Sequence, residues 1–479
     1  MKNKIIITAI VFFSVAQTIF AQDTISPAQT FSLKQCVEIA IKNNLQVKES
    51  EYQLRTDNVT LLLAKGNALP FVNASIFHGE NQGRSIDPFT NSYLNQQILY
   101  ANYGVNASVT LWNGSAIQNS IKQNKLAYQA SAKDLQQQKD DITISVILAY
   151  LQVLNNQEIL NAATEQASVT AKQAERLASL HKEGATAPAN YFDVKGQLAG
   201  DEITVTEAKA NVETSKILLA QLMNINYSAE MKLETTTGDV PAAMYESGTE
   251  EIYEQARKNL ALIQAAELRK LSADKGLKAA RGAMLPLLSL NGSLGTNYSN
   301  AAATNTLIST ADQPTDAYVT LDGVKYPVYS PQSSYSSKKI SYASQWSNNF
   351  NSQVSIGLQI PILNGLQNKG RVQQAKVQQE RAAFLNNTVK IQLKQNIDQA
   401  YINMQSAFER YQKLTTQLQD YTESFRTIEI RFNAGALTSV DYVIAKNNMD
   451  RSQINLIAAK YDYILRTKIL DYYQGKLSW

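Results

Sequence analysis

Two long stretches without glycine or proline constrain the fold of this chain more than any other feature. One lies between Gly114 and Gly184, and the other lies between Gly370 and Gly435. A helix rises about 1.5 Å per residue, so each stretch predicts a helix of up to roughly 100 Å. Apolar positions in the first stretch recur every seven residues, namely Ile121, Tyr128, Leu135, Ile142 and Ala149. This spacing is typical of coiled-coil packing, and such helices do not fit a compact globular domain.

An alternating strand precedes each long helical stretch. The first strand, at about 102–112, places apolar residues such as Val105 and Val109 against polar or small neighbours. The second strand, at about 350–363, has the same alternation. Alternation with a period of two is typical of a strand with one apolar and one polar face. Each strand reaches its helix through a similar junction, Trp112-Asn113-Gly114 in the first case and Leu363-Asn364-Gly365 in the second.

The two halves of the chain repeat each other. Residues up to Pro70 recur at a shift of 216, ending at Pro286, and residues from Asn113 recur at a shift of 251. The 35 additional residues fall in the second loop, 297–349, which we expect to be a surface loop. The pattern of each half therefore predicts the same order of elements, namely a helix, a strand, a loop, a strand, a long helix, a turn and a shorter helix.

The repeat defines the expected domain boundaries. We expect a first repeat at 22–230, a linker at 231–248 and a second repeat at 249–479. The first repeat is expected to open with one helix from about Leu33, after the capping-box residues Ser32 and Gln35, and to close it before Pro70. The remaining expected elements are strands at about 71–79, 102–112, 287–296 and 350–363, and long helices at 113–182, 186–225, 364–433 and 437–473.

The N-terminal segment and the composition limit where the protein can be located and which functions it can have. Residues 1–21 have lysines, a short apolar run and a final alanine, which predicts a cleaved secretory signal. The net charge of +4 gives no electrostatic case for nucleic acid. Cys36 is the only cysteine, so no intramolecular disulfide can form, and its helical position favours a small buried side chain. No catalytic, metal-ligating or cofactor-binding motif is present, so we expect no enzyme activity, cofactor or metal.

The four strands have the length of tilted transmembrane β-strands. A half-buried soluble sheet would show the same alternation, but the rest of the sequence supplies no core for it. Four strands cannot close on themselves, and an open edge is not viable in lipid. Two chains would give eight strands with a filled interior, whereas three would give twelve and leave a lumen.

The duplicated junctions and the two turns carry a family resemblance. The turns are Gly184-Ala185-Thr186 and a second run from Gly435 to Asp441. Together with the junctions, they resemble the TolC family of outer-membrane efflux proteins over the whole mature chain. The resemblance implies a homotrimer with a twelve-stranded barrel in the outer membrane that continues into an α-helical periplasmic tunnel. It also implies a passive exit duct of a tripartite efflux pump or type I secretion system. A periplasmic adaptor and an inner-membrane pump or ABC transporter would dock at the tunnel tip and open it.

The resemblance also implies site residues. In the family, acidic side chains after the second turn narrow the periplasmic mouth, and here that segment has Asp441 but has Ile444 in place of the second acid. The shift of 251 places Asn190 opposite Asp441 and Asp193 opposite Ile444. We expect Asp441 and Asp193 to form a cation-favouring collar. Both acids equally fit a plain structural role as helix-start carboxylates beside the helix dipole.

The turns themselves are the expected contact for adaptor hairpins. Gly184 and Ala185 form the first of these docking turns, and Gly435 and Ala436 form the second. Simple helix C-caps would have the same sequence, because glycine readily adopts the left-handed conformation.

Two other classes of function remain open from the sequence. One is a coiled-coil scaffold or adhesin without a pore, in the periplasm or on the surface, and a more distant one is a periplasmic hydrolase. In a channel of this kind the lining of the outlet does not select the cargo, because the pump selects it.

Overall fold

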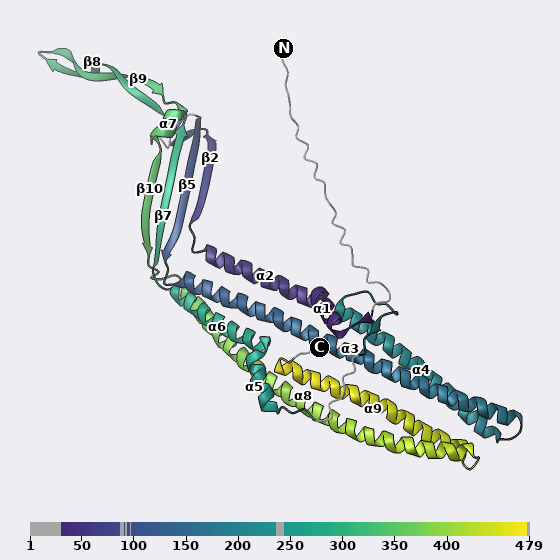
Figure 1. Ribbon diagram of the computed structural model, residues 1–479. Helices are drawn as coiled ribbons and strands as arrows, with labels where there is room; N and C mark the ends of the chain where they lie inside the picture. The colour runs from purple at the N-terminus through teal and green to yellow at the C-terminus, as the bar shows by residue number, and fades with distance from the viewer. Residues whose placement is uncertain (1–29, 87–90, 92, 96, 236–243, 477–479) are drawn as a thin grey trace, which may run out of the picture. The chain divides into compact units, whose positions relative to one another are not determined.

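A computed structural model describes residues 30–86, 91, 93–95, 97–235 and 244–476 (Figure 1). The expected signal segment and part of the expected linker lie outside these residues. The chain divides into two compact units. Unit 1 comprises 1–51, 135–260 and 391–479, and unit 2 comprises 52–134 and 261–390. Both sequence repeats contribute to both units, so the compact units do not coincide with the repeats.

Apart from the short helix α7 (Tyr342–Asn348), the described helices occur in matched pairs, one from each half of the chain. The pairs are α1 (Leu33–Asn43) with α5 (Thr249–Asn259), α2 (Leu45–Gly66) with α6 (Ala261–Gly282), α3 (Ala116–Lys182) with α8 (Gln367–Asn433), and α4 (Pro188–Met223) with α9 (Ser439–Gln474). Both members of a pair have the same length, which is 11, 22, 67 and 36 residues in that order. The helix lengths therefore match between the two halves of the chain. At about 1.5 Å per residue the two longest helices extend roughly 100 Å.

The expected first helix is two helices, so that prediction was wrong. The capping box of Ser32 and Gln35 starts α1 as expected, but the backbone becomes extended at Asn44. The Asn44 side-chain oxygen then accepts hydrogen bonds from the backbone N–H groups of Gln46 and Val47. Asparagine at a helix start satisfies donors that the new helix leaves free, so this residue both ends α1 and begins α2.

Unit 2 contains a four-stranded antiparallel sheet with the strand order β10-β7-β5-β2. Its strands are β2 (Phe71–Asn81), β5 (Ile98–Trp112), β7 (Leu287–Ser299) and β10 (Asn351–Gln359). Strand β10 is shorter than the expected 350–363. Its last residue pairs with Leu287, the first residue of β7. Pro286 precedes Leu287 and Pro361 lies in the expected extension, and proline has no N–H with which to continue a ladder.

The second loop is not simply a loop, which corrects a further prediction. Residues 297–349 contain a long two-stranded hairpin, β8 (Ala303–Leu321) and β9 (Val324–Lys339), followed by α7 (Tyr342–Asn348) (Figure 1). The turn is Asp322-Gly323, and both residues have a positive φ. An Asp-Gly pair between apolar residues is a strong hairpin signal, so this element was accessible from sequence. The first loop also contains a small hairpin, β3 (Arg84–Ile86) with β4 (Tyr93–Asn95).

Two apolar clusters lie among the described residues of unit 1. One surrounds the short parallel pairing of β1 (Thr30–Phe31) with β6 (Lys232–Leu233) and contains residues of α1, α3 and α4. Cys36 is fully buried there, as expected, and burial raises the pKa of its thiol to about 12. The other cluster lies near the turns between the long helices. Across the described part of the chain, no helix is both long and apolar enough to span a bilayer.

Candidate functional site

The two turns have the same backbone geometry. We call α3 with α4 the first hairpin and α8 with α9 the second hairpin. Gly184 and Gly435 have φ values of 74° and 76°, in the left-handed region. The backbone N–H of Ala185 donates to Leu180 (2.8 Å), and that of Ala436 donates to Arg431 (2.9 Å). These bonds are those of glycine helix C-caps, and all four turn residues named as docking candidates are exposed.

Asp441 belongs to the N-terminal cap of α9. Its Oδ2 atom accepts hydrogen bonds from the backbone N–H (3.2 Å) and the hydroxyl (2.7 Å) of Thr438. The Thr438 hydroxyl in turn accepts from the Asp441 N–H, which completes a capping box. The side-chain and backbone hydrogen bonds from Thr438 lower the pKa of Asp441 below its usual value. The carboxylate is therefore committed to the helix start in this conformation, while the residue remains exposed.

Asn190 and Asp193 connect the first hairpin to the second. The Asn190 side-chain oxygen accepts from the backbone N–H of Ser439 at 3.2 Å, so a residue of α4 satisfies a free donor of α9. The Ser439 hydroxyl donates to Asp193 at 2.7 Å. Ser439 is buried, whereas Ile444 is exposed. The structure thus brings Asn190 and Asp193 together around Ser439, a contact that the repeat alignment could not reveal.

Aromatic side chains fill the space behind the turns. Phe432 stacks on Tyr442 with ring centroids 4.9 Å apart, and Phe425 lies 5.5 Å from Tyr442. In the first hairpin, His181 stacks on Tyr191 at 5.3 Å. The rings pack α3, α4, α8 and α9 near their turns.

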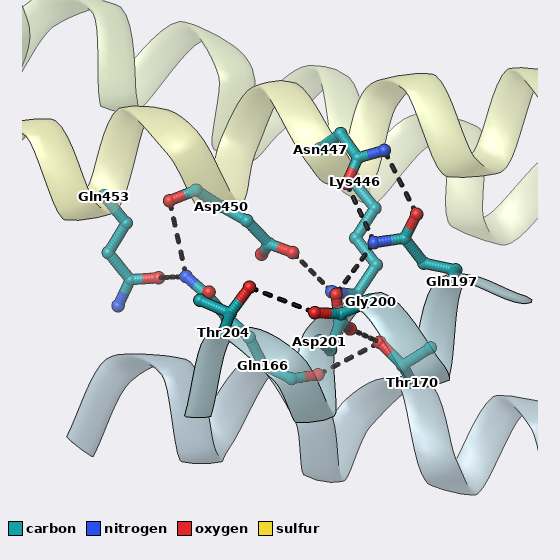
Figure 2. Close-up of polar contacts among 10 residues, drawn as sticks. All are labelled: Gln166, Thr170, Gln197, Gly200, Asp201, Thr204, Lys446, Asn447, Asp450 and Gln453. Atoms are coloured by element: carbon teal, nitrogen blue, oxygen red, sulfur yellow. Dashed lines mark hydrogen bonds and ion pairs between the residues drawn. The ribbon is translucent and has the colours of Figure 1, made fainter. Parts of the chain in front are cut away.

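A buried ionic cluster lies further along α4 and α9, and sequence reasoning missed it (Figure 2). Lys446 is only 1% exposed, and its ammonium contacts Asp201 of α4 at 3.0 Å and also Asp450 of α9. Thr170 of α3 donates to Asp201. The Lys446–Asp450 spacing of four residues along one helix was visible in the sequence, but it did not distinguish a buried pair from a solvated one.

Neutral polar side chains extend the same network between the hairpins. Gln197 and Asn447 exchange two hydrogen bonds of 2.9 and 3.1 Å (Figure 2). Gln166 of α3 donates to Gln453 of α9 at 3.0 Å. Arg176 of α3 donates to the side chain of Asn433 on α8, and to its backbone carbonyl at 3.1 Å. The first hairpin therefore contacts the second through polar groups at several levels behind the turns.

The sheet of unit 2 has one polar face and one apolar face. A polar row crosses all four strands in register, Asn73, Asn106, Ser293 and Gln353, and lines a shallow hollow. On the other face lie Val109, Leu290 and Ile356, also in register. Ile76 and Val354 are 73% and 78% exposed. No element of the described residues covers these apolar side chains, as a lipid-facing surface requires.

Aromatic residues mark both ends of the apolar face. At one end Tyr103 contacts Trp346 of α7, with ring centroids 4.8 Å apart, and the Tyr103 hydroxyl hydrogen-bonds that of Tyr342. At the other end a bulge at the end of β5 places Trp112 opposite Leu288 on the same face. Trp112 lies nine positions after Tyr103, which corresponds to about 30 Å along a strand. With the usual tilt this matches the apolar band of about 25 Å, with an aromatic girdle on each side, of outer-membrane strands.

The strand–helix junctions differ in how tightly they pack. A Cβ atom at Gly114 would lie 2.5 Å from the carbonyl oxygen of Gly282 at the end of α6, so only glycine fits there. Asn113 accepts a hydrogen bond from the Ile117 N–H at the start of α3. Gly365 has a similar φ of 62° but no close neighbour, and Leu363 beside Asn364 is exposed.

The described residues contain no group of three or more potential metal ligands. A sheet with an uncovered apolar band, combined with duplicated hairpins of very long helices, defines the class of outer-membrane channel proteins. A family model for the outer membrane efflux proteins matches residues 36–224 and 252–471. The chain therefore belongs to the outer membrane efflux protein family, and it is an efflux channel of the outer membrane with helices in the periplasm.

Individual relatives agree with this assignment. The chain is 23% identical over 376 residues to outer membrane protein TolC of Vibrio cholerae, which covers 78% of this chain and 76% of that protein. Its fold is similar to that of the outer-membrane channel OprN, with a TM-score of 0.74 and 15% identity over 93% of this chain and 90% of that one. The outer membrane protein VceC of Vibrio cholerae is similar with a TM-score of 0.72 and 13% identity, over 92% of this chain and 96% of that one. The resemblance derived from the residues is thereby confirmed.

Proposed function

We propose that three copies of this chain form the exit duct of a tripartite efflux pump or type I secretion system. The observation that carries the proposal is the four-stranded sheet, which has an uncovered apolar face and two unpaired edges, β2 and β10, among the described residues. Unpaired backbone groups cannot remain exposed in lipid. If the β10 edge of one chain pairs with the β2 edge of the next, the backbone groups of both edge strands form hydrogen bonds.

Three copies suit a conduit better than two. Eight strands leave an interior that side chains fill, whereas twelve leave a lumen. The polar row from Asn73 to Gln353 would then line the lumen, and the apolar row would face lipid. The long helices of the three chains would form the periplasmic tunnel.

The contacts between the hairpins support a closed tip that opens when they separate. Ser439 is held by Asn190 and Asp193, and Lys446 is held by Asp201. Separation of α4 from α9 would break each of these bonds. An adaptor that binds the exposed turns at Gly184-Ala185 and Gly435-Ala436, together with its inner-membrane pump, is suitably placed to drive that separation.

The collar hypothesis remains part of this proposal. Asp441 and Asp193 lie near the start of α9 together with Asn190, and Ile444 is one turn further on. In a trimer the two acids would give two carboxylates per chain close to the mouth, which favours cations over anions.

Membrane behaviour tests the proposal. Purified protein should need detergent, should cross-link as a trimer, and should produce stepwise single-channel conductance in planar bilayers. A soluble protein without conductance would instead support a coiled-coil scaffold or adhesin. A deletion strain assayed against a compound panel and for a missing secreted protein would then identify the cargo.

A further inference from the structure

The buried cluster around Lys446 does not balance its charges. Two carboxylates, Asp201 and Asp450, face one ammonium, and the side chains of both acids are only 11% exposed (Figure 2). Helix α3 contributes Gln166 and Thr170, which carry no charge. From α8, Glu429 lies close enough to act on the buried phenol of Tyr442, and so do Asp201 and Asp450. The groups around Lys446 thus carry an excess of negative charge, which is costly to bury.

The hydrogen bonds distribute unequally between the two acids. Asp201 accepts from three side chains, those of Thr170, Gln197 and Lys446. Among the described residues, the side chain of Asp450 accepts only from Lys446, through Oδ2. Its Oδ1 atom is buried and has no hydrogen-bond partner within the described part of the chain. Donors stabilise an ionised carboxylate, so Asp201 is suited to carry the charge that pairs with Lys446, and Asp450 is suited to take up a proton.

We propose that Asp450 is a proton-binding site whose occupancy stabilises the contact between α4 and α9, so that proton uptake closes the tip and proton release opens it. The coupling to opening rests on the proposed function, whereas the proton site itself does not. With one proton on the Asp450 carboxyl the cluster is neutral. When that proton leaves, two buried carboxylates share the single ammonium of Lys446, and hydration can relieve the excess negative charge only if the hairpins separate.

The direction of the pH effect follows from the burial of Asp450. Burial raises the pKa of this carboxyl, the nearby Lys446 lowers it in part, and the Asp201 charge raises it further. The packed state thus binds the proton more tightly than a hydrated state does. Its stabilisation is complete below the ordinary carboxyl pKa of about 4 and is lost as the pH rises through the raised pKa. Above the raised pKa, the equilibrium constant for separation of the hairpins levels off. Between the ordinary and the raised pKa it should increase by at most about tenfold per pH unit and per chain.

Single-channel recordings across this pH range test the coupling. The wild type should open more often as the pH rises. Asp450→Asn should stay mostly closed without a pH response, because the amide cannot ionise. The matched control is Asp462→Asn on the same helix. Its carboxylate is 34% exposed and pairs with Arg466, so this variant should keep the wild-type profile. A wild-type pH response in Asp450→Asn would overturn the proposal.

Two further measurements keep the proton site testable without conductance. Asp134 and Asp140 also have a pKa raised by burial, so infrared difference spectra of the wild type should show the carbonyl stretch of one more protonated carboxylic acid than those of Asp450→Asn. Asp201→Asn leaves Asp450 as the sole counter-charge of Lys446, so both the infrared titration and the opening curve should shift to lower pH. An infrared band of undiminished intensity in Asp450→Asn, or curves that Asp201→Asn leaves unmoved, would contradict the assignment.

Discussion

Single side chains at the start of α9 serve both the helix and the contact with the other hairpin. Thr438 and Asp441 satisfy each other's backbone N–H groups, and Asn190 satisfies that of Ser439. Four N–H groups at a helix start have no partner within the helix, so these residues fix where α9 begins. The candidate collar acids are therefore also structural residues in this conformation.

Thr438→Ala should destabilise the start of α9 by about 1 kcal/mol, the usual effect of losing an N-cap side chain. The pKa of Asp441 is lowered in the fold, so its contribution is present above the ordinary carboxyl pKa and lost as the pH falls through the lowered pKa. Hydrogen exchange of the first turn of α9 measures both effects, with Thr438→Ser as the control. Equal exchange in the alanine and serine variants would contradict the capping role.

Asp441→Asn combined with Asp193→Asn should reduce the preference of the channel for cations, because both carboxylates of the expected collar are removed. Reversal potentials in a salt gradient measure that preference. The control is Asp462→Asn, which removes a carboxylate on α9 away from the turn. If the double variant keeps its cation selectivity, these acids do not form the collar.

At the scale of elements, both hairpins end in the same glycine cap but pack differently behind it. Phe432 and Tyr442 fill the second hairpin, whereas His181 and Tyr191 stack in the first. The exposed residue after each glycine is an alanine. A small side chain at that position leaves the turn accessible to a partner.

Ala185→Arg with Ala436→Arg should abolish efflux and leave the trimer in the outer membrane, because a bulky charge at both turns obstructs docking without touching a buried contact. Minimum inhibitory concentrations and membrane immunoblots measure the two outcomes. The paired serine variants should transport normally. Efflux that persists in the arginine variant at normal trimer levels would remove the turns from the docking site.

The two faces of the sheet differ in what they tolerate. Val354→Lys places a charge on the apolar face. If the residue lies at the bilayer midplane, the substitution should lower the free energy of unfolding in the membrane by about 2–4 kcal/mol. Gln353→Lys, one residue earlier on the polar face, should assemble normally. Unfolding of the two variants in lipid bilayers measures the difference, and equal stability would contradict the assignment of the faces.

At the scale of the whole molecule, the hairpin β8–β9 is the main departure from the internal duplication. Neither strand pairs with the four-stranded sheet, and the backbone of Ile340 donates to Ala302 at the hairpin base. An isolated two-stranded hairpin is only marginally stable. The hairpin β8–β9 can therefore be removed at its base, between Ala302 and Ile340, without interrupting another sheet.

Replacing residues 303–339 by an Asn-Gly turn should leave trimer yield and channel conductance steps detectable, because no ladder of the four-stranded sheet is interrupted. Semi-native gels and bilayer recordings measure these properties. As a control, an equally long deletion that removes β7 should abolish assembly. Loss of trimers in the hairpin deletion would show that the hairpin belongs to the assembly interface.

The sequence by itself determined the elements and their duplication. The long helices follow from local periodicity and from the positions of glycine and proline, and the faces of the sheet follow from the alternation of apolar and polar residues. Both patterns involve only residues that are close together in the chain. The resemblance of the junctions and turns also sufficed for the family. An asparagine cap at Asn44 and the Asp322-Gly323 turn were local signals too, and the sequence reading missed both.

Only the tertiary structure decided which distant residues meet. Asn190 reaches Ser439, and Asp201 reaches Lys446, across about 245 residues of sequence. Whether Lys446 is solvated or buried depends on the packing of α4 against α9, because a charged residue on a long helix fits either environment until its neighbours are placed. Individual helices and strands could thus be predicted from the sequence, whereas the contacts behind the turns depend on how the two hairpins pack against each other.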